Sequence, residues 1–435
     1  MTTHTERRAV ALLTGPSAGE MLSLALGEGI LRSWRLRAVN HRPGAGISVG
    51  YSVTWDEVRH KSSAREVRER QDGYVVASTA RIPQSRLDAA GAVTLYAGDL
   101  PVHLWEFPGD PELPALADAC NPEAMAGLVG ECDVELLGYR PTRRAVLRVQ
   151  THAGLSYAKV VRPDALDALI TRHRVVADAE LPTPRVVVCR PDGLVVTSAV
   201  EGESLALSFQ SGRDLPSIFR SLTRTLNALP ASALDLKYRP AWAERCEHYA
   251  RAAGAASPEL TGRVLDLAAG IMAVRRSADY GPLVPTHGDF YETNLLVSGG
   301  RLSGLLDLDS LGPGYRADDW GCLLGHLSVL PGLSDKYAGA RQIQEDWYRR
   351  ASHDADPAAI AASAAGVVLS LVASARQRGR ADWKDQAHSR LVVAEEWLRP
   401  GPPPPPPPPN RGNRTTPENP PPPTTPTKTP PPAPP

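Results

Sequence analysis

The chain has 435 residues and carries 48 basic and 48 acidic side chains, so its net charge at neutral pH is zero. Nucleic acids and anionic membrane surfaces attract proteins with an excess of basic residues, so this balance argues against both as partners. The length exceeds one typical domain, and we expect two or three units with a large buried core.

The cysteines favour a reducing compartment. They are odd in number, widely spaced and form no CxxC pair, which argues against a zinc site or a disulfide framework: Cys120, Cys132, Cys189, Cys246 and Cys322. The first apolar run is short and is broken by Gly15 and Pro16, so we predict neither a signal peptide nor a membrane span. A cytoplasmic location is the expectation.

Residues 1–130 are predicted to form a β-rich module. Apolar residues at helical spacing over 17–31 predict a helix with Ser17 as N-cap and Glu20 at the capping-box position. From Arg35 the pattern changes to that of strands and remains so to about residue 106. The module contains no metal-ligand spacing, no glycine loop before a helix and no nucleophile beside a base. We interpret it as a cap or docking module.

A short echo links this module to the next one. Asn40-His41-Arg42-Pro43 precedes one predicted strand pair, and Gly138-Tyr139-Arg140-Pro141 precedes another. Shared turn chemistry or an internal duplication would each produce this similarity. The stretch between the two is rich in proline and then helical, so we place a boundary near residue 130.

Residues 131–202 are predicted to form a small β lobe. Three antiparallel strands are expected over 133–162, and the third contains Lys159 between apolar neighbours. The chain has only six lysines, at positions 61, 159, 237, 336, 384 and 428, so this one stands out. A hairpin turned at Asp192-Gly193 and an extended strand complete the lobe.

The remaining chain divides in two. Residues 203–399 read as mostly helical and are predicted to form a larger lobe. Residues 400–435 are rich in proline, threonine and asparagine, and a tract without apolar residues is expected to stay disordered with polyproline II character.

The most informative stretch runs from residue 286 to 327. His287-Gly288-Asp289 forms a loop, Asn294 follows, and two short strands joined at Gly299-Gly300 lead to Asp307. Phosphoryl transfer needs a carboxylate to accept the proton of the attacking hydroxyl, and oxygen ligands to hold Mg²⁺. We assign Asp289 as the base and Asn294 with Asp307 as the metal pair.

This order of residues resembles the catalytic segment of the aminoglycoside phosphotransferase and choline kinase family, whose members phosphorylate small molecules. Gly314 and Asp318-Asp319 before a helix extend the resemblance. It implies an α+β, bilobal protein-kinase-like fold, with ATP or GTP as phosphate donor and Mg²⁺ as cofactor. It also implies that Asp319 holds the catalytic loop, that His287 supports it, and that Asp309 is an acidic companion.

The resemblance also implies a nucleotide site in the small lobe. Lys159 would neutralise the phosphates, and backbone groups of Ala199, Val200 and Glu201 would bind adenine at the hinge between the lobes. The turn at residues 141–144 lacks a GxGxxG, so it would cover phosphate with backbone amides and with Arg143 or Arg144.

The helix predicted after Lys159 departs from the family pattern. Kinase-like folds place an acid there to pair with the lysine, but this helix offers Arg172, His173 and Arg174 at its middle. Asp167, Asp178 or Glu180 are the candidate partners, and the sequence does not choose among them.

The resulting expectation is a Mg²⁺-dependent phosphotransferase acting on a hydroxyl of a small molecule, with its oligomeric state left open. Residues 203–285 hold eight acidic and ten basic side chains, which favours a neutral, sugar-like acceptor over a polycationic aminoglycoside. The alternative is a catalytically weak, nucleotide-binding regulatory or scaffold protein. A protein kinase is disfavoured, because the chain has neither Asp-Phe-Gly nor Ala-Pro-Glu in the required places.

Overall fold

The computed structural model describes residues 3–42, 44–60, 66–375 and 382–399. The proline-rich tract predicted for residues 400–435 lies outside the described residues. In the described part, no helix is both long and apolar enough to cross a membrane. All five cysteines are free thiols, as predicted.

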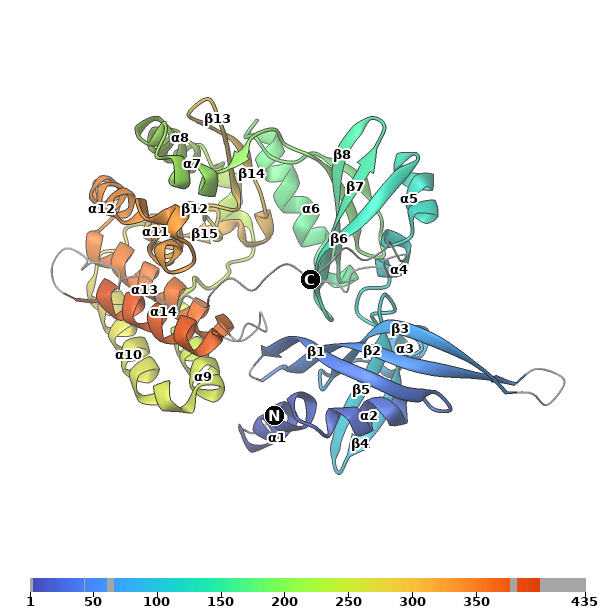
Figure 1. The fold of residues 1–435 in the computed structure, drawn as a ribbon. Coiled ribbons are helices and arrows are strands. Elements are labelled where there is room, and N and C mark those ends of the chain that lie inside the picture. The colour runs from blue at the N-terminus through green and yellow to red at the C-terminus, as the bar shows by residue number, and fades with distance from the viewer. Residues whose placement is uncertain (1–2, 43, 61–65, 376–381, 400–435) are drawn as a thin grey trace, which may run out of the picture.

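The N-terminal module is a five-stranded antiparallel sheet with two helices before it (Figure 1). The sheet has the order β1-β2-β3-β5-β4, and the elements are α1 (Thr3–Thr14), α2 (Ala18–Ala25), β1 (Ile30–Arg42), β2 (Gly46–His60), β3 (Glu66–Ser78), α3 (Gln84–Ala89), β4 (Val93–Ala97) and β5 (Leu100–Glu106). Leu13 and Leu22 from the two helices join Val49 and Tyr51 of β2 in one core. The helix predicted over 17–31 is shorter, because β1 already begins at Ile30.

The second module is another five-stranded antiparallel sheet, of order β6-β7-β8-β10-β9. Two short helices lead into it, and the elements are α4 (Leu116–Ala119), α5 (Pro122–Val129), β6 (Cys132–Arg140), β7 (Arg144–Thr151), β8 (Gly154–Val161), α6 (Pro163–Asp178), β9 (Val186–Cys189) and β10 (Leu194–Ser198). The three strands predicted over 133–162 are therefore present, with Lys159 on the third.

The two sheets have the same topology. Each is a three-stranded meander, then a helix, then a hairpin whose second strand pairs with the third strand of the meander. Arg42 pairs with Gly46 beside the turn between β1 and β2, as Arg140 pairs with Arg144 beside the turn between β6 and β7. The echo in the sequence therefore falls at equivalent positions, which favours internal duplication over shared turn chemistry.

The register extends this equivalence to the functional residues. Two positions after Gly46, Ser48 pairs with Ser78 of β3. Two positions after Arg144, Val146 pairs with Lys159 of β8. Ser78 is thus the counterpart of Lys159, and Gly46 is the counterpart of Arg144.

The two sheets also share a core. Tyr74 and Trp105 of the first sheet are buried in one cluster with Tyr139 and Leu147 of the second. The Trp105 Nε1–H donates to Tyr139 Oη at 3.2 Å. The N-terminal module is therefore packed firmly on the small lobe and is not a loosely tethered domain.

The third part is mainly helical. Its α-helices are α7 (Leu205–Ser211), α8 (Leu215–Asn227), α9 (Cys246–Ala256), α10 (Thr261–Ser277), α11 (Arg316–Val329), α12 (Ala340–Ala351), α13 (Pro357–Ser374) and α14 (Trp383–Trp397). Short 3₁₀ turns are η1 (Ala231–Asp235), η2 (Ala243–Arg245), η3 (Pro258–Leu260), η4 (Leu308–Ser310), η5 (Leu330–Gly332) and η6 (Asp335–Tyr337). The buried Trp320 and Trp347 and the mostly apolar α13 lie in its single large core.

Two small sheets carry the predicted catalytic segment on this helical part. One joins β11 (Glu203–Ser204), β13 (Leu295–Ser298) and β14 (Arg301–Leu305), and the other joins β12 (Val284–Thr286) and β15 (Gly312–Gly314). Gly299 and Gly300 have φ of 55° and 71°, the left-handed values that a two-residue hairpin turn requires. The second strand of this hairpin ends at Leu305, and Asp307, two residues later, is left-handed with φ of 53°.

The chain is thus an α+β protein with a bilobal, kinase-like arrangement. A small antiparallel β lobe faces a larger helical lobe, and the β-rich N-terminal module packs on the small lobe (Figure 1). The last strand of the small lobe, β10, leads through residues 199–202 into the helical lobe. This connection places the predicted catalytic hairpin, which is formed by β13 and β14 and leads to Asp307, opposite Lys159.

Candidate active site

Helix α11 fixes the loop before Asp289 through hydrogen bonds. The side chain of Asp319, in the first turn of α11, accepts the backbone N–H of His287 at 3.1 Å and that of Gly288 at 2.9 Å. Asp319 is fully buried, and burial raises its pKa to about 6. The two accepted hydrogen bonds favour its charged form and fix the backbone that carries Asp289.

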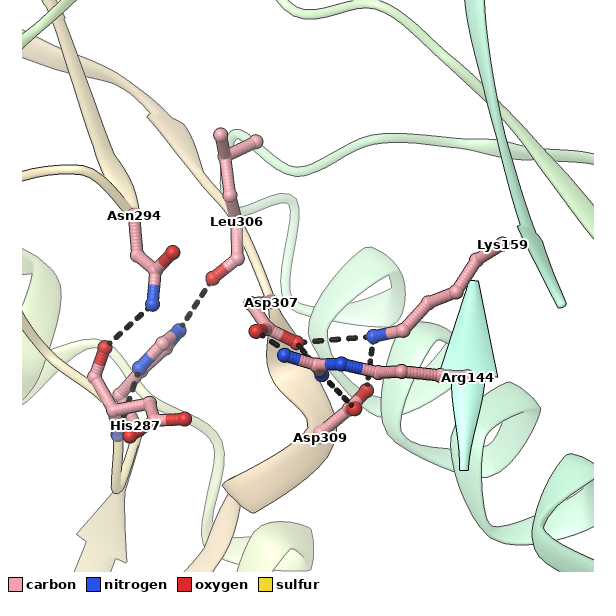
Figure 2. A network of polar contacts seen from close by, with 8 residues as sticks. Arg144, Lys159, His287, Asn294, Leu306, Asp307 and Asp309 are labelled. Atoms are coloured by element: carbon pink, nitrogen blue, oxygen red, sulfur yellow. Dashed lines mark hydrogen bonds and ion pairs between the residues drawn. The ribbon is translucent and has the colours of Figure 1, made fainter. Parts of the chain in front are cut away.

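His287 ties the loop to the hairpin. Its Nε2 lies 2.9 Å from the carbonyl oxygen of Leu306, and its Nδ1 accepts the Asp289 N–H at 3.3 Å. Burial lowers the pKa of His287 to about 4, so the ring is neutral near pH 7 and donates through Nε2. His287 therefore spans the loop and the segment leading to Asp307, as Figure 2 shows.

Asn294 closes the loop from the other side. Its Nδ2 donates to the backbone carbonyl of Asp289 at 2.9 Å, and the side chain is 7% exposed. Because the amide nitrogen is used in this way, the side-chain oxygen is the atom left to bind a ligand.

Two cations from the small lobe meet two carboxylates of the helical lobe (Figure 2). Lys159 Nζ lies 3.0 Å from Asp307 Oδ1 and 2.6 Å from Asp309 Oδ1. Arg144 Nη1 lies 2.9 Å from Asp309 Oδ2 and 3.4 Å from Asp307 Oδ2. All four side chains are mostly buried, so the cluster is screened weakly and links the two lobes.

The cluster separates the protonation behaviour of the carboxylates. Burial alone would raise the pKa of Asp307, but Lys159 and Arg144 together hold it below its usual value. Burial raises the pKa of Asp289 to about 7, and the nearby charge of Asp307 adds to the rise. The two carboxylates therefore differ: the pKa of Asp307 lies below its usual value, and that of Asp289 lies near neutral pH.

The prediction that an acid on the helix after Lys159 pairs with this lysine is wrong. Lys159 pairs with Asp307 and Asp309, and neither Asp167 nor Asp178 nor Glu180 takes part in these contacts. The buried Arg172 of α6 instead donates from its Nε to the Leu311 carbonyl at 3.0 Å. Arg172 needs no carboxylate partner here, because a backbone carbonyl accepts its N–H.

A family model described as the phosphotransferase enzyme family, APH, matches residues 135–353. The chain belongs to this family. The match begins in β6 and ends after α12, so it includes Arg144, Lys159 and the whole catalytic hairpin. Membership makes the chain a small-molecule phosphotransferase by family.

Solved structures of modest similarity include aminoglycoside phosphotransferases and a choline kinase. A thermostable mutant of APH(4)-Ia in its apo form is 15% identical, and the match covers 63% of this chain and 98% of that one, with a TM-score of 0.47. APH(3'')-Id from Streptomyces rimosus is 19% identical over 57% and 96%, with a TM-score of 0.40. Choline kinase from Cryptosporidium parvum is 11% identical over 65% and 93%, with a TM-score of 0.44. A comparison with curated proteins found no match.

The predicted hinge of this phosphotransferase lies directly after β10. The Ala199 N–H donates to the Leu155 carbonyl at 3.2 Å, which joins the hinge to β8. Val200 packs close to Gly304 of β14, where an added Cβ would lie 2.9 Å from its Cγ1. Glu201 is exposed. The backbone at residues 199–201 is therefore positioned by both lobes.

Sequence reasoning missed a group of basic and aromatic residues near Asp289. Arg245 opposes the rise in the pKa of Asp289, and its guanidinium lies 4.8 Å from the centre of the Trp242 ring. Trp242 stacks on Tyr249 with ring centres 5.7 Å apart. These residues come from η2 and α9, far from the motif in sequence, and no local pattern marks them.

Proposed function

We propose that this protein transfers the γ-phosphate of ATP or GTP to a hydroxyl group of a small molecule, with Mg²⁺ as cofactor. The observation that carries the proposal is the meeting of Lys159 and Arg144 with Asp307 and Asp309, next to the loop that presents Asp289. Positioning and charge neutralisation are what phosphoryl transfer asks of a protein.

Asp289 is the proposed base. With a pKa of about 7, its carboxylate is able to accept the proton of an acceptor hydroxyl as that oxygen attacks phosphorus. Asp319 and His287 act as positioning residues: Asp319 accepts the Gly288 N–H, and His287 Nδ1 accepts the Asp289 N–H.

The residues present fit a magnesium ion. Asp307 contributes carboxylate oxygens and Asn294 its amide oxygen, the hard donors that Mg²⁺ prefers. Among the described residues no three acidic, histidine or cysteine side chains converge on one point, so the ion would rely on this pair and on phosphate oxygens. When bound, Mg²⁺ would neutralise phosphate charge, and Asp307 is kept ionised for it by Lys159 and Arg144.

The acceptor proposed is a neutral, hydroxyl-rich molecule such as a sugar. Arg144 and Arg245 both act on Asp289 electrostatically, and Trp242 with Tyr249 supplies a flat aromatic surface nearby. A polycationic aminoglycoside would be repelled by these arginines. A screen of sugars, aminoglycosides, nucleosides and amino alcohols that follows nucleotide consumption tests this choice.

The decisive variant is Asp289→Asn. It keeps the shape of the side chain but removes the base, so we expect transfer to fall by at least about 10²-fold with nucleotide binding retained. The variant should also be more stable at pH 8, on the order of 1–3 kcal/mol, because the raised pKa of Asp289 means that its ionised form destabilises the fold. This gain is present above the folded pKa of about 7 and vanishes below the unfolded value.

Chemical denaturation at pH 8 and at pH 4 measures that gain, and a coupled assay measures transfer. A variant that is stabilised but inactive supports the assigned base. Equal activity in the two proteins would show that another group accepts the proton. Binding of MgATP to the unmodified protein without turnover of any acceptor would favour the regulatory or scaffold alternative.

A further inference from the structure

A cavity of about 330 Å³ lies where the two five-stranded sheets meet, and none of its lining residues comes from the segment 286–309. Its walls come from the turn between β1 and β2, from the segment after β3, and from the turn between β6 and β7. Figure 1 shows the sheet β1–β5 beside the sheet β6–β10. A volume of this size is enough for a compact small molecule.

The walls are related by the internal duplication. Residues 44–46 and 141–143 are the equivalent turns of the two sheets, and both line the cavity. Arg81 lies three residues after Ser78, and Arg162 lies three residues after the equivalent Lys159; both arginines also line the cavity. Each sheet therefore contributes the same two pieces of its structure to opposite walls.

The cavity is strongly basic. Four arginines line it, Arg81, Arg140, Arg143 and Arg162, against the single acid Glu112. The carboxylate of Glu112 is already matched by two guanidiniums, with Arg86 at 2.7 Å and Arg162 at 3.0 Å. Positive charge therefore exceeds negative charge on these walls.

The walls are built before any ligand arrives. Gly46 has a φ of 101°, and a Cβ placed on it would lie 3.0 Å from the backbone of Thr79 and Ala80, so the first turn is fixed against the segment after β3. On the opposite wall the Thr142 N–H donates to Asp110 Oδ2 at 2.8 Å. Asp110 is 3% exposed and holds this second turn in place.

We propose that this cavity is a binding site for a small polyanion that carries phosphate groups, distinct from the phosphate-transfer site. Guanidinium groups bind phosphate oxygens with paired, charge-assisted hydrogen bonds, and four arginines line this cavity. Arg140 and Arg143 line the cavity, and Arg144 of the same turn contacts Asp307 and Asp309. The site is independent of which acceptor the enzyme uses.

The ligand has two sources, a free phosphorylated molecule or the phosphates of the donor nucleotide, and two variants separate them. Binding of inorganic pyrophosphate to the full chain is measured by calorimetry without Mg²⁺. Arg81→Gln should weaken binding by about tenfold or more, the loss of one charge-assisted contact, whereas Lys159→Ala should leave it within about twofold. Arg35→Gln, an exposed arginine of β1 that does not line the cavity, is the matched control.

Three results would overturn the proposal. The first is absence of pyrophosphate binding to the unmodified chain at millimolar concentration. The second is binding to Arg81→Gln at the strength seen with Arg35→Gln. The third is a loss in Lys159→Ala as large as that in Arg81→Gln, which would place the anion in the nucleotide site. Thermal unfolding of Arg81→Gln verifies that the variant is folded.

Discussion

The sheets β1–β5 and β6–β10 share strand order, direction and register, yet among the described residues only the second forms ion pairs with Asp307 and Asp309. In the second sheet Arg144 and Lys159 reach the carboxylates of Asp307 and Asp309. At the equivalent positions the first sheet has Gly46 and Ser78.

The difference shows how little of the backbone specifies the chemistry. Ser78 is fully buried, its hydroxyl lies 2.8 Å from Ser48 Oγ, and it accepts the Ala80 N–H at 3.1 Å. Gly46 lies against the segment after β3. Positions that hold cations against Asp307 and Asp309 in one sheet thus serve internal packing in the other, and the side chains make the difference.

The largest effect is expected from exchanging the two equivalent positions for alanine. Lys159→Ala removes a cation from the proposed phosphate site, and kcat/KM should fall by about 10²–10³-fold. Ser78→Ala removes only hydrogen bonds inside the first sheet, and the folded protein should transfer phosphate within about twofold of the unmodified rate. Steady-state kinetics on both variants measures the contrast.

Denaturation provides the complementary reading. Ser78→Ala should lose roughly 1 kcal/mol of stability through its hydrogen bonds, so the two variants separate activity from stability. Similar losses of activity in both would mean that the first sheet supports catalysis directly, and the contrast drawn between the sheets would be wrong.

The next effect is pH dependence, which belongs to Asp289, the carboxylate whose pKa is affected by burial, by Asp307 and by Arg144 of the second sheet. A base must be ionised, and the pKa of Asp289 is about 7, so kcat/KM should fall about tenfold per unit as pH drops below 7. This fall below pH 7, the acid limb of the profile, should be absent from the residual activity of Asp289→Asn.

Glu292 supplies the control for this profile. Burial raises its pKa to about 7 as well, but it lies near His326 and not in the Lys159 cluster. Glu292→Gln should therefore keep the acid limb. Loss of the limb in this variant would transfer the titration from Asp289 to Glu292.

Much of the site follows from local sequence signals. The loop with Asp289, the hairpin turned at Gly299-Gly300 and the strand with Lys159 are each specified by neighbouring residues, and the structure places them as a local reading predicts. The pairing of Lys159 with Asp309 was not predictable in this way. The two residues are 150 positions apart in the sequence and belong to different lobes, so only the packing of the lobes brings them together. Helix α6 lacks the acid that the family pattern places there, and its buried Arg172 donates instead to a backbone carbonyl.

The topology of residues 1–130 was predictable only as a β-rich pattern. The four-residue echo at Arg42 and Arg140 was compatible with coincidence, and only the pairing register showed that both residues end equivalent strands. The division of the chain at residue 130 stays a prediction, because the two sheets share one core across it.

The smallest effect tests that shared core. Asp110 joins the two sheets by accepting the Tyr139 hydroxyl at 2.6 Å, the Thr142 N–H at 2.8 Å and the Glu112 N–H at 2.9 Å. Asp110→Ala leaves these buried donors without an acceptor and should cost roughly 2 kcal/mol. Asp118→Ala, on the same connecting segment, removes a half-exposed ion pair with Arg190 and should stay within about 0.5 kcal/mol. Urea unfolding compares them. Since the sheets share one core, Asp110→Ala should shift a single transition to lower urea, whereas two separated transitions would show that the sheets unfold independently.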